Sequence, residues 1–509
     1  VLTDRHHGLR VPLLAACRPH ATMGGVRRWT VVVDLCLVAV CALVAALLGQ
    51  DANWDQLQYH YWYPWQLLHG GFTDPDLYGG RFQNPLPQVP FYLLVTSLPP
   101  VVAQAALGAI AGTAAVVARR IAARIIPASG GWLLALSTAA AAAAMVGAGF
   151  RSEVGTSYSD VWLATMLLGG LLLILRGGLW PALWAGVLAG ASVGLKYTSA
   201  PFAIAAMAAL LAISHQRLAR LGLWVLGAVV GWAVTGAWWA WHLWRTYDSP
   251  VFPFWNTIFG SRWFPAESLT DERYGVSGTQ EWLRWPWDMA TGTARVLDLA
   301  VRDPRWLALG VILVLAAIGY RGITRPAVAV ITFAAIGTVV WLAVFGVLRY
   351  AIPAEMLVGV LVVWALTLVL SDRVAMGVAV VAVVLAGVLT QSAQGRRVAF
   401  GETWFAVQPG AFAEVQAGDV VLVDGQYPST FLLPGNLPDG TDVHVVQKDF
   451  TDTALRDWLV ADLERAPRIW VVTGRPPSQV DPAIGTIDYD NCTRIRSNVV
   501  DRWLCPMTL

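Results

Sequence analysis

The chain has 509 residues, of which 56% are hydrophobic and only 13% are charged. Such a composition is far more apolar than that of a soluble globular domain and is typical of a polytopic membrane protein. The net charge of +2, with no basic stripe and no Cys/His zinc spacing, argues against a nucleic acid as the partner.

Apolar runs long enough to cross a hydrocarbon core of about 30 Å recur along the chain. They predict about eleven transmembrane helices, at residues 30–49, 91–118, 131–150, 160–176, 179–195, 198–214, 221–243, 305–320, 327–348, 354–370 and 374–391. The short runs between 177 and 197 also fit one broken helix. No small-residue cleavage site follows the first run, so it is expected to be a retained helix and not a removed signal peptide.

Charge placement predicts the orientation of these helices in a cell membrane. Basic residues precede the first run, which keeps residues 1–29 in the cytoplasm by the positive-inside rule; they are Arg5, Arg10, Arg18, Arg27 and Arg28. Further arginines fall in alternate connections. The segments of unusual composition then lie outside the cell, as does the C-terminus.

Residues 394–509 have the composition and the strand and helix patterns of a soluble domain outside the membrane. Buried strands are predicted at 419–425, 442–447 and 468–474, with a helix at 453–465, so a small α/β domain should follow the transmembrane domain of residues 30–393. Cys492 and Cys505 can form a disulfide in an oxidising exterior, the alternative being two free thiols.

The first outer segment, residues 50–90, combines acids, histidines and many aromatics at the exit of a membrane helix. Asp55 is followed by Tyr59 and His60, and Asn84 opens an Asn-Pro-Leu turn before the next span. These residues resemble the first outer loop of polyprenyl-phosphate-dependent glycosyltransferases of the GT-C superfamily. Further similar motifs, in the family's order, are Asp160 in YSDVWLAT, Lys196-Tyr197-Thr198, SPVFPFWN at 249–256, and Arg349-Tyr350 with Pro353.

The resemblance implies an enzyme that transfers a sugar from a lipid phosphate carrier to an acceptor with inversion. Such a reaction needs a carboxylate to accept the acceptor's proton and cations to stabilise the departing phosphate. Asp55 matches the family's catalytic aspartate and is expected to be the general base. Its alternative role is to cap the helix that follows. Asp51 is the second candidate base, because it lies four residues earlier and would share a helical face.

The resemblance also suggests residues that bind substrate. Lys196 and Arg349, at the outer ends of spans, are expected to bind the donor phosphate, although either could instead extend to lipid headgroups. Asp160 is expected to be a second acid that orients hydroxyls, with helix capping as its alternative. The remaining substrate-binding candidates are Tyr59, His60, Asn84, Tyr197 and Tyr350.

A divalent metal is a possible cofactor. Asp74 and Asp76 form an Asp-x-Asp motif of the kind that holds such ions, but the same pattern is common in turns. His60 and His69 do not have the spacing of zinc ligands. The Trp-rich stretch from 244 to 287 fits an element that lies on the outer lipid leaflet.

The sequence therefore predicts an α-helical polytopic membrane glycosyltransferase with an extracytoplasmic α/β domain. Its expected partners are a polyprenyl-phosphate sugar, a glycan, lipid or protein acceptor of the cell envelope, and membrane lipids. One alternative is a transporter or flippase for a lipid-linked glycan. Transporters place charges near the midplane, however, whereas these motifs cluster at outer helix ends. Another alternative is a glycan polymerase or ligase with a diphosphate-linked donor.

Overall fold

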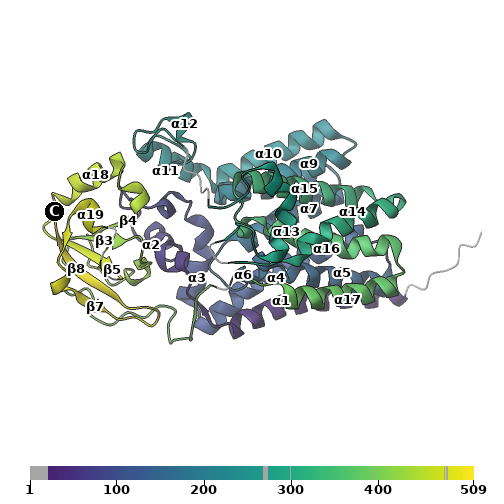
Figure 1. The fold of residues 1–509 in the computed structure, drawn as a ribbon, viewed down its shortest axis with the longest axis horizontal. Helices are drawn as coiled ribbons and strands as arrows, with labels where there is room; N and C mark the ends of the chain where they lie inside the picture. The colour runs from purple at the N-terminus through teal and green to yellow at the C-terminus, as the bar shows by residue number, and fades with distance from the viewer. Residues whose placement is uncertain are drawn as a thin grey trace, which may run out of the picture.

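The computed structural model describes residues 21–267, 273–297, 300–393, 395–474, 476, 478 and 480–509. Arg5, Arg10 and Arg18 lie outside this part. The described chain forms a long helical bundle with a small sheet domain at one end, and the short helix α2 (Trp62–His69) lies between the two (Figure 1). The mostly helical architecture with a C-terminal α/β domain agrees with the sequence-based expectation.

Every apolar run that the sequence marks as a span contains a helix. In chain order these helices are α1 (Ala21–Leu47), α4 (Pro100–Ile125), α5 (Gly130–Met145), α7 (Asp160–Arg176), α8 (Leu179–Leu195), α9 (Ala200–Ile213), α10 (Arg217–Thr235), α14 (Ala308–Ile318), α15 (Arg325–Val344), α16 (Ile352–Val369) and α17 (Asp372–Leu389). Within the described chain, six helices are long and apolar enough to cross a membrane by length and composition. The count of eleven spans stays a prediction.

Small residues allow α8 and α10 to pack backbone against backbone. Gly186 and Gly190 of α8 lie against the backbone of α10, and Gly227 and Gly231 of α10 lie against the backbone of α8. A Cβ atom added at Gly190 would lie 1.9 Å from the carbonyl oxygen of Ala228. Glycine at four-residue spacing is the usual way for membrane helices to approach this closely, because association in lipid depends on packing. The same pair of helices ends beside the candidate site.

Several of the predicted spans are interrupted, among them 91–118 and 221–243. The run at 91–118 is divided between α3 (Val89–Ser97) and α4, because Pro99 and Pro100 cannot donate the backbone hydrogen bonds that a continuous helix requires. The run at 221–243 is divided between α10 and α11 (Ala237–Tyr247) at Gly236. A Cβ atom at Gly236 would lie 2.6 Å from the Cα of Gly194, so the break occurs where α10 touches the end of α8.

The outer segments form short elements above the bundle. The first segment contains β1 (Gln50–Asp51), the π-helix η1 (Gln56–His60), α2 and two 3₁₀ turns, η2 (Gly79–Phe82) and η3 (Leu86–Gln88). The second contains α6 (Ala148–Glu153). The Trp-rich segment contains α11, α12 (Asn256–Phe259) and α13 (Thr279–Thr291). Trp241, Trp244, Trp255 and Trp287 are exposed, which suits the predicted contact with lipid.

The C-terminal domain is a mixed sheet in the order β4-β3-β5-β8-β6, with β7 paired to β8. Its strands are β3 (Val420–Asp424), β4 (Asp442–Val446), β5 (Ile469–Thr473), β6 (Thr486–Ile487), β7 (Thr493–Ile495) and β8 (Arg502–Thr508). The three predicted strands are β3, β4 and β5, which pair in parallel and are buried, and the predicted helix is α18 (Ala454–Leu463); α19 (Asp481–Ile484) follows. Cys492 and Cys505 form the predicted disulfide.

The domain is joined to the first outer segment by backbone pairing. β2 (Arg397–Val398) pairs antiparallel with β1, and Leu77 forms a parallel bridge with Val446 at the edge of the sheet. The first outer segment thus covers an edge strand that would otherwise leave backbone groups unpaired. This contact could not be predicted from the sequence, because it joins residues more than 300 positions apart.

Candidate functional site

Asp55 lies at the start of the π-helix η1 and is bonded to two side chains from different parts of the chain. Its Oδ2 atom accepts hydrogen bonds from Arg349 Nη1 at 2.9 Å and from Tyr59 Oη at 3.0 Å. The Asp55 side chain makes no capping hydrogen bond to η1. Its predicted alternative role as a helix cap is therefore not the role it has here. A π-helix is rare and is found most often at functional sites.

Burial raises the pKa of Asp55, but the charge of Arg349, the neighbouring His60 and the two hydrogen bonds together outweigh it and hold the pKa below its usual value. Asp55 is thus a carboxylate at neutral pH. About 15% of its side chain is exposed, so it can be reached by a substrate. Arg349 can donate a further hydrogen bond, since its Nε atom has no partner in the described part of the chain.

Lys196 and Asp160 form a second ion pair next to the first. Lys196 Nζ, at the end of α8, lies 2.7 and 2.9 Å from the two carboxylate oxygens of Asp160, at the start of α7. The Tyr350 ring lies beside both cations, 4.7 Å from Lys196 Nζ and 5.4 Å from Arg349 Cζ. The structure therefore brings four of the predicted residues, Asp55, Arg349, Lys196 and Asp160, together near the ring of a fifth, Tyr350.

His60 and Asp51 are buried, and both form hydrogen bonds with Ser157 of the second outer segment. His60 Nδ1 lies 2.8 Å from Ser157 Oγ, and burial lowers the pKa of His60 to about 3, so the ring is neutral. Asp51 is fully buried, and its Oδ2 accepts bonds from Asn53 at 2.6 Å and from the Ser157 backbone at 2.9 Å. Because Asp51 lies in a strand, it does not share a helical face with Asp55.

Asn84 and Tyr197 are engaged in structural hydrogen bonds. The Asn84 amide donates to the carbonyl oxygens of Gly194 and Thr235, both at 2.9 Å, which ties the Asn-Pro-Leu turn to the ends of α8 and α10. The Tyr197 hydroxyl donates to Pro250 at 3.2 Å and ties the KYT motif to the Trp-rich segment. Both residues therefore fix the position of the segments that surround the two ion pairs.

Asp74 and Asp76 surround an arginine. Arg81, almost fully buried, lies 2.9 Å from Asp74 and 3.9 Å from Asp76, and its guanidinium lies over the Phe72 ring. Burial raises the pKa of Asp76 to about 7. Among the described residues no group of three His, Cys, Asp or Glu side chains could hold a metal ion. The residues around this Asp-x-Asp motif fit an arginine and not a divalent metal.

The second outer segment contributes two residues that were not among the predicted site residues. The Tyr158 ring lies 4.6 Å from Arg349 Cζ and 5.5 Å from the His60 ring, so it packs between two predicted site residues. Glu153 is buried close by and carries an unpartnered oxygen atom. Their only signal in the sequence is an acid and an aromatic among small polar residues in RSEVGTSYSD.

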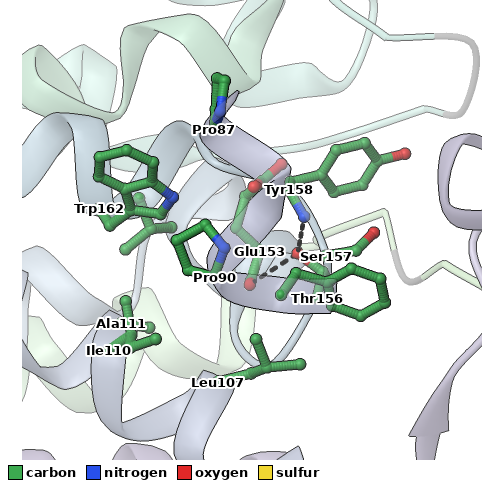
Figure 2. Close-up of a pocket in the computed structure, with 12 residues that line it drawn as sticks. Pro87, Pro90, Leu107, Ile110, Ala111, Glu153, Thr156, Ser157, Tyr158 and Trp162 are labelled. Atoms are coloured by element: carbon green, nitrogen blue, oxygen red, sulfur yellow. Dashed lines mark hydrogen bonds between the residues drawn. The ribbon is translucent and has the colours of Figure 1, made fainter. Parts of the chain in front are cut away.

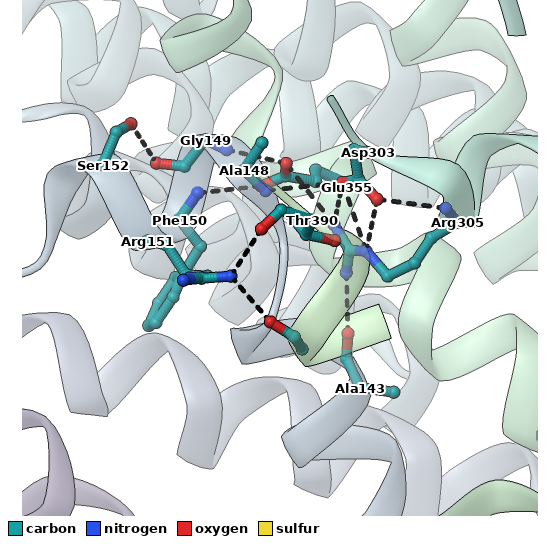
Figure 3. Close-up of polar contacts among 11 residues, drawn as sticks. Ala143, Ala148, Gly149, Phe150, Arg151, Ser152, Asp303, Arg305, Glu355 and Thr390 are labelled. Atoms are coloured by element: carbon teal, nitrogen blue, oxygen red, sulfur yellow. Dashed lines mark hydrogen bonds and ion pairs between the residues drawn. The ribbon is translucent and has the colours of Figure 1, made fainter. Parts of the chain in front are cut away.

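A buried ionic network holds the second outer segment in position (Figure 3). Glu355 accepts hydrogen bonds from the backbone of Gly149 and Phe150, both at 2.8 Å, at the start of α6. Arg305 lies between Glu355, at 3.4 Å, and Asp303, at 2.5 Å. Removing one member would leave a buried charge unpaired, which is strongly destabilising, so α6 has little freedom to move.

Comparison with solved structures gives a fold match. ArnT from Cupriavidus metallidurans in the apo state shares 13% sequence identity with this chain, with a TM-score of 0.53 over 95% of this chain and 98% of that one. ArnT from Cupriavidus metallidurans bound to undecaprenyl phosphate shares 17% identity, with a TM-score of 0.48 over 71% of this chain and 63% of that one, less than two-thirds of its length. No protein-family model matches the chain. No curated protein matches it either.

The match to the apo structure shows that the chain shares its overall fold with ArnT. Together with the six long apolar helices of the described chain, it identifies a multi-pass membrane protein.

Proposed function

We propose that the chain is an integral membrane glycosyltransferase that moves a sugar from a polyprenyl-phosphate donor to an acceptor outside the cytoplasm. The observation that carries the proposal is the pair of ion pairs, Asp55 with Arg349 and Lys196 with Asp160, whose cations both lie beside the Tyr350 ring. Two cations and a base at the outer ends of apolar helices are what transfer from a lipid phosphate requires.

The donor phosphate binds between Lys196 and Arg349. Lys196 is 14% exposed and Arg349 21% exposed, so both are accessible without unfolding. A phosphate that approaches Arg349 competes with Asp55 for the guanidinium, and the planar fork of arginine suits two phosphate oxygens. Asp160 stays beside Lys196 and is placed to accept hydrogen bonds from hydroxyl groups of the substrate.

Phosphate binding makes Asp55 a stronger base. Arg349 is the largest influence that lowers the Asp55 pKa, so partial neutralisation of Arg349 by phosphate raises it. Asp55 then accepts the proton of the acceptor hydroxyl as the acceptor oxygen bonds to the anomeric carbon. The bond between that carbon and the phosphate oxygen breaks on the opposite face, and its electron pair leaves with the phosphate, which the two cations stabilise.

The charges lie at helix ends, and this favours transfer over transport. A transporter holds its substrate near the membrane midplane on broken helices. Here Lys196 follows the last residue of α8, and Arg349 lies in the turn η7 (Leu348–Ala351) before α16. Both ion pairs therefore lie in the layer where the bundle meets the outer segments.

The direct test is incubation of the purified protein in lipid nanodiscs with radiolabelled polyprenyl-monophosphate and polyprenyl-diphosphate sugars and a cell-envelope extract. We expect label to move from a monophosphate donor to the extract. Transfer from diphosphate donors alone would favour a polymerase or ligase. Movement of intact donor across the bilayer without transfer would favour a flippase.

A further inference from the structure

Glu153 is the one acid of the second outer segment that no ion pair explains. It ends α6 and is 4% exposed, and its Oε2 atom has no hydrogen-bond partner in the described part of the chain. Unpartnered buried oxygens are uncommon in folded proteins and call for an explanation.

Glu153 lines a small cavity between the second outer segment and helices α3, α4 and α7 (Figure 2). The cavity volume is about 30 Å³, which is room for one water-sized group. One side is apolar, with Phe91, Leu107 and Trp162, and the other carries Glu153 and Ser157. The Ser157 hydroxyl is already bonded to Asn53 and His60, so Glu153 supplies the unused polar atom.

The surroundings of Glu153 favour its neutral form. The nearby cations are engaged elsewhere, Lys196 with Asp160 and Arg349 with Asp55. Burial, followed by repulsion from Asp160 and Asp51, raises the pKa of Glu153 well above its usual range, although Arg349 and Lys196 oppose the shift. This upward shift favours the protonated carboxyl, which can donate a hydrogen bond.

We propose that Glu153 is a substrate-contacting residue, whose buried carboxyl forms a hydrogen bond with one hydroxyl group of the substrate, and that this cavity accommodates the hydroxyl. The inference rests on the proposed function, and the hydroxyl belongs either to the sugar of the donor or to the acceptor. A site built to bond a hydroxyl rejects analogues that lack it, because its own polar group is then left unpaired. An apolar side chain of similar volume would pack against the apolar lining of this cavity without an unpaired oxygen, so packing does not account for glutamate here.

The test compares Glu153→Gln, Glu153→Met and the exposed control Glu464→Gln for transfer, donor binding and thermal unfolding. Glutamine keeps a neutral donor, so transfer should stay within a few-fold of the wild-type rate. Methionine removes the donor and the unpaired oxygen, so the unfolding midpoint should equal or exceed that of the wild type. Its transfer should fall by about ten-fold or more.

The kinetic change in Glu153→Met identifies the source of the hydroxyl. Weaker donor binding assigns it to the sugar, and a raised acceptor KM at unchanged donor affinity assigns it to the acceptor. The wild type should lose activity as the pH rises through the Glu153 pKa, while Glu153→Gln should not. Full transfer by Glu153→Met, a lowered unfolding midpoint in it, or loss of transfer in Glu153→Gln would each overturn the inference. An inactive wild type would instead overturn the proposed function.

Discussion

Asp55 and Arg349 are joined by a 2.9 Å ion pair although they lie 294 positions apart in the chain. The proposed base and a proposed phosphate ligand thus neutralise each other in the protein without substrate. The donor phosphate competes with Asp55 for Arg349, and this competition raises the Asp55 pKa. This arrangement makes base strength depend on donor binding, and it predicts that the donor binds before the acceptor.

Replacement of Arg349 by alanine should move the pH dependence of transfer as well as weaken donor binding. Arg349 opposes the effect of burial on Asp55, so its removal raises the Asp55 pKa. Asp55 is then deprotonated only at higher pH, and the acid limb of the profile of kcat/KM should shift upward, since that limb reports the free enzyme. Arg349→Lys, which keeps a charge, should shift it less. An unchanged acid limb in Arg349→Ala would mean that the limb belongs to another group.

Lys196→Ala should reduce donor affinity by about ten-fold to a hundred-fold, the usual effect of losing a charged hydrogen bond. It also leaves Asp160, which is 4% exposed, without its cation, so the unfolding midpoint should fall. The double variant with Asp160→Asn should recover the midpoint but not the affinity. Wild-type donor affinity in a folded double variant would remove Lys196 from the phosphate site.

The sequence indicated individual residues of the site but not which of them contact one another. Asp55, Lys196, Arg349 and Asp160 could be singled out because charge at the end of an apolar run is costly without a role. Their pairing could not be foreseen, since it depends on how helices far apart in the chain come together. Periodicity indicates which residues are buried, but not which of them touch.

Other features escaped prediction for the same physical reason. Arg81 completes the Asp74 and Asp76 motif from five residues beyond it, which made an arginine cluster resemble a metal motif. Glu355 is a buried acid in the first turn of α16, and the sequence alone did not link it to the second outer segment. The predicted strands β3, β4 and β5 were readable because parallel strands buried on both faces are continuous apolar runs.

We expect the C-terminal domain to contribute to acceptor access and also to support the loop that carries Asp55. The Thr430 hydroxyl donates to the carbonyl oxygens of Leu57 and Gln58 in η1, and the Ser429 backbone donates to the Gln58 side chain at 2.9 Å. Thr430→Val keeps the shape but removes the donor, so turnover should fall several-fold while donor affinity is kept.

Thr441→Val is the matched control for this prediction, because the Thr441 hydroxyl is buried without a partner in the described chain. Its loss should change neither turnover nor stability adversely. A raised acceptor KM with unchanged turnover in Thr430→Val would confine the domain to acceptor access.

Gly190→Ala should destabilise the bundle. The added methyl group would overlap the Ala228 carbonyl at 1.9 Å, so α8 and α10 must move apart at a cost of about 1–3 kcal/mol or more. Gly222→Ala, on α10 with no atom within 4 Å of its Cβ position, should be neutral or stabilising. Thermal unfolding in nanodiscs measures both variants, and equal midpoints would show that the helices are not in backbone contact.

The most direct measurement of the central claim is sugar transfer by Asp55→Asn, compared with wild type and with the exposed control Asp457→Asn. Asparagine can keep the hydrogen bonds to Arg349 and Tyr59 but cannot accept a proton. Donor binding and the unfolding midpoint should therefore be retained, while transfer from the polyprenyl-phosphate sugar falls by about 10²–10⁴-fold. Transfer by folded Asp55→Asn at a rate close to wild type would contradict the assignment of Asp55 as the base.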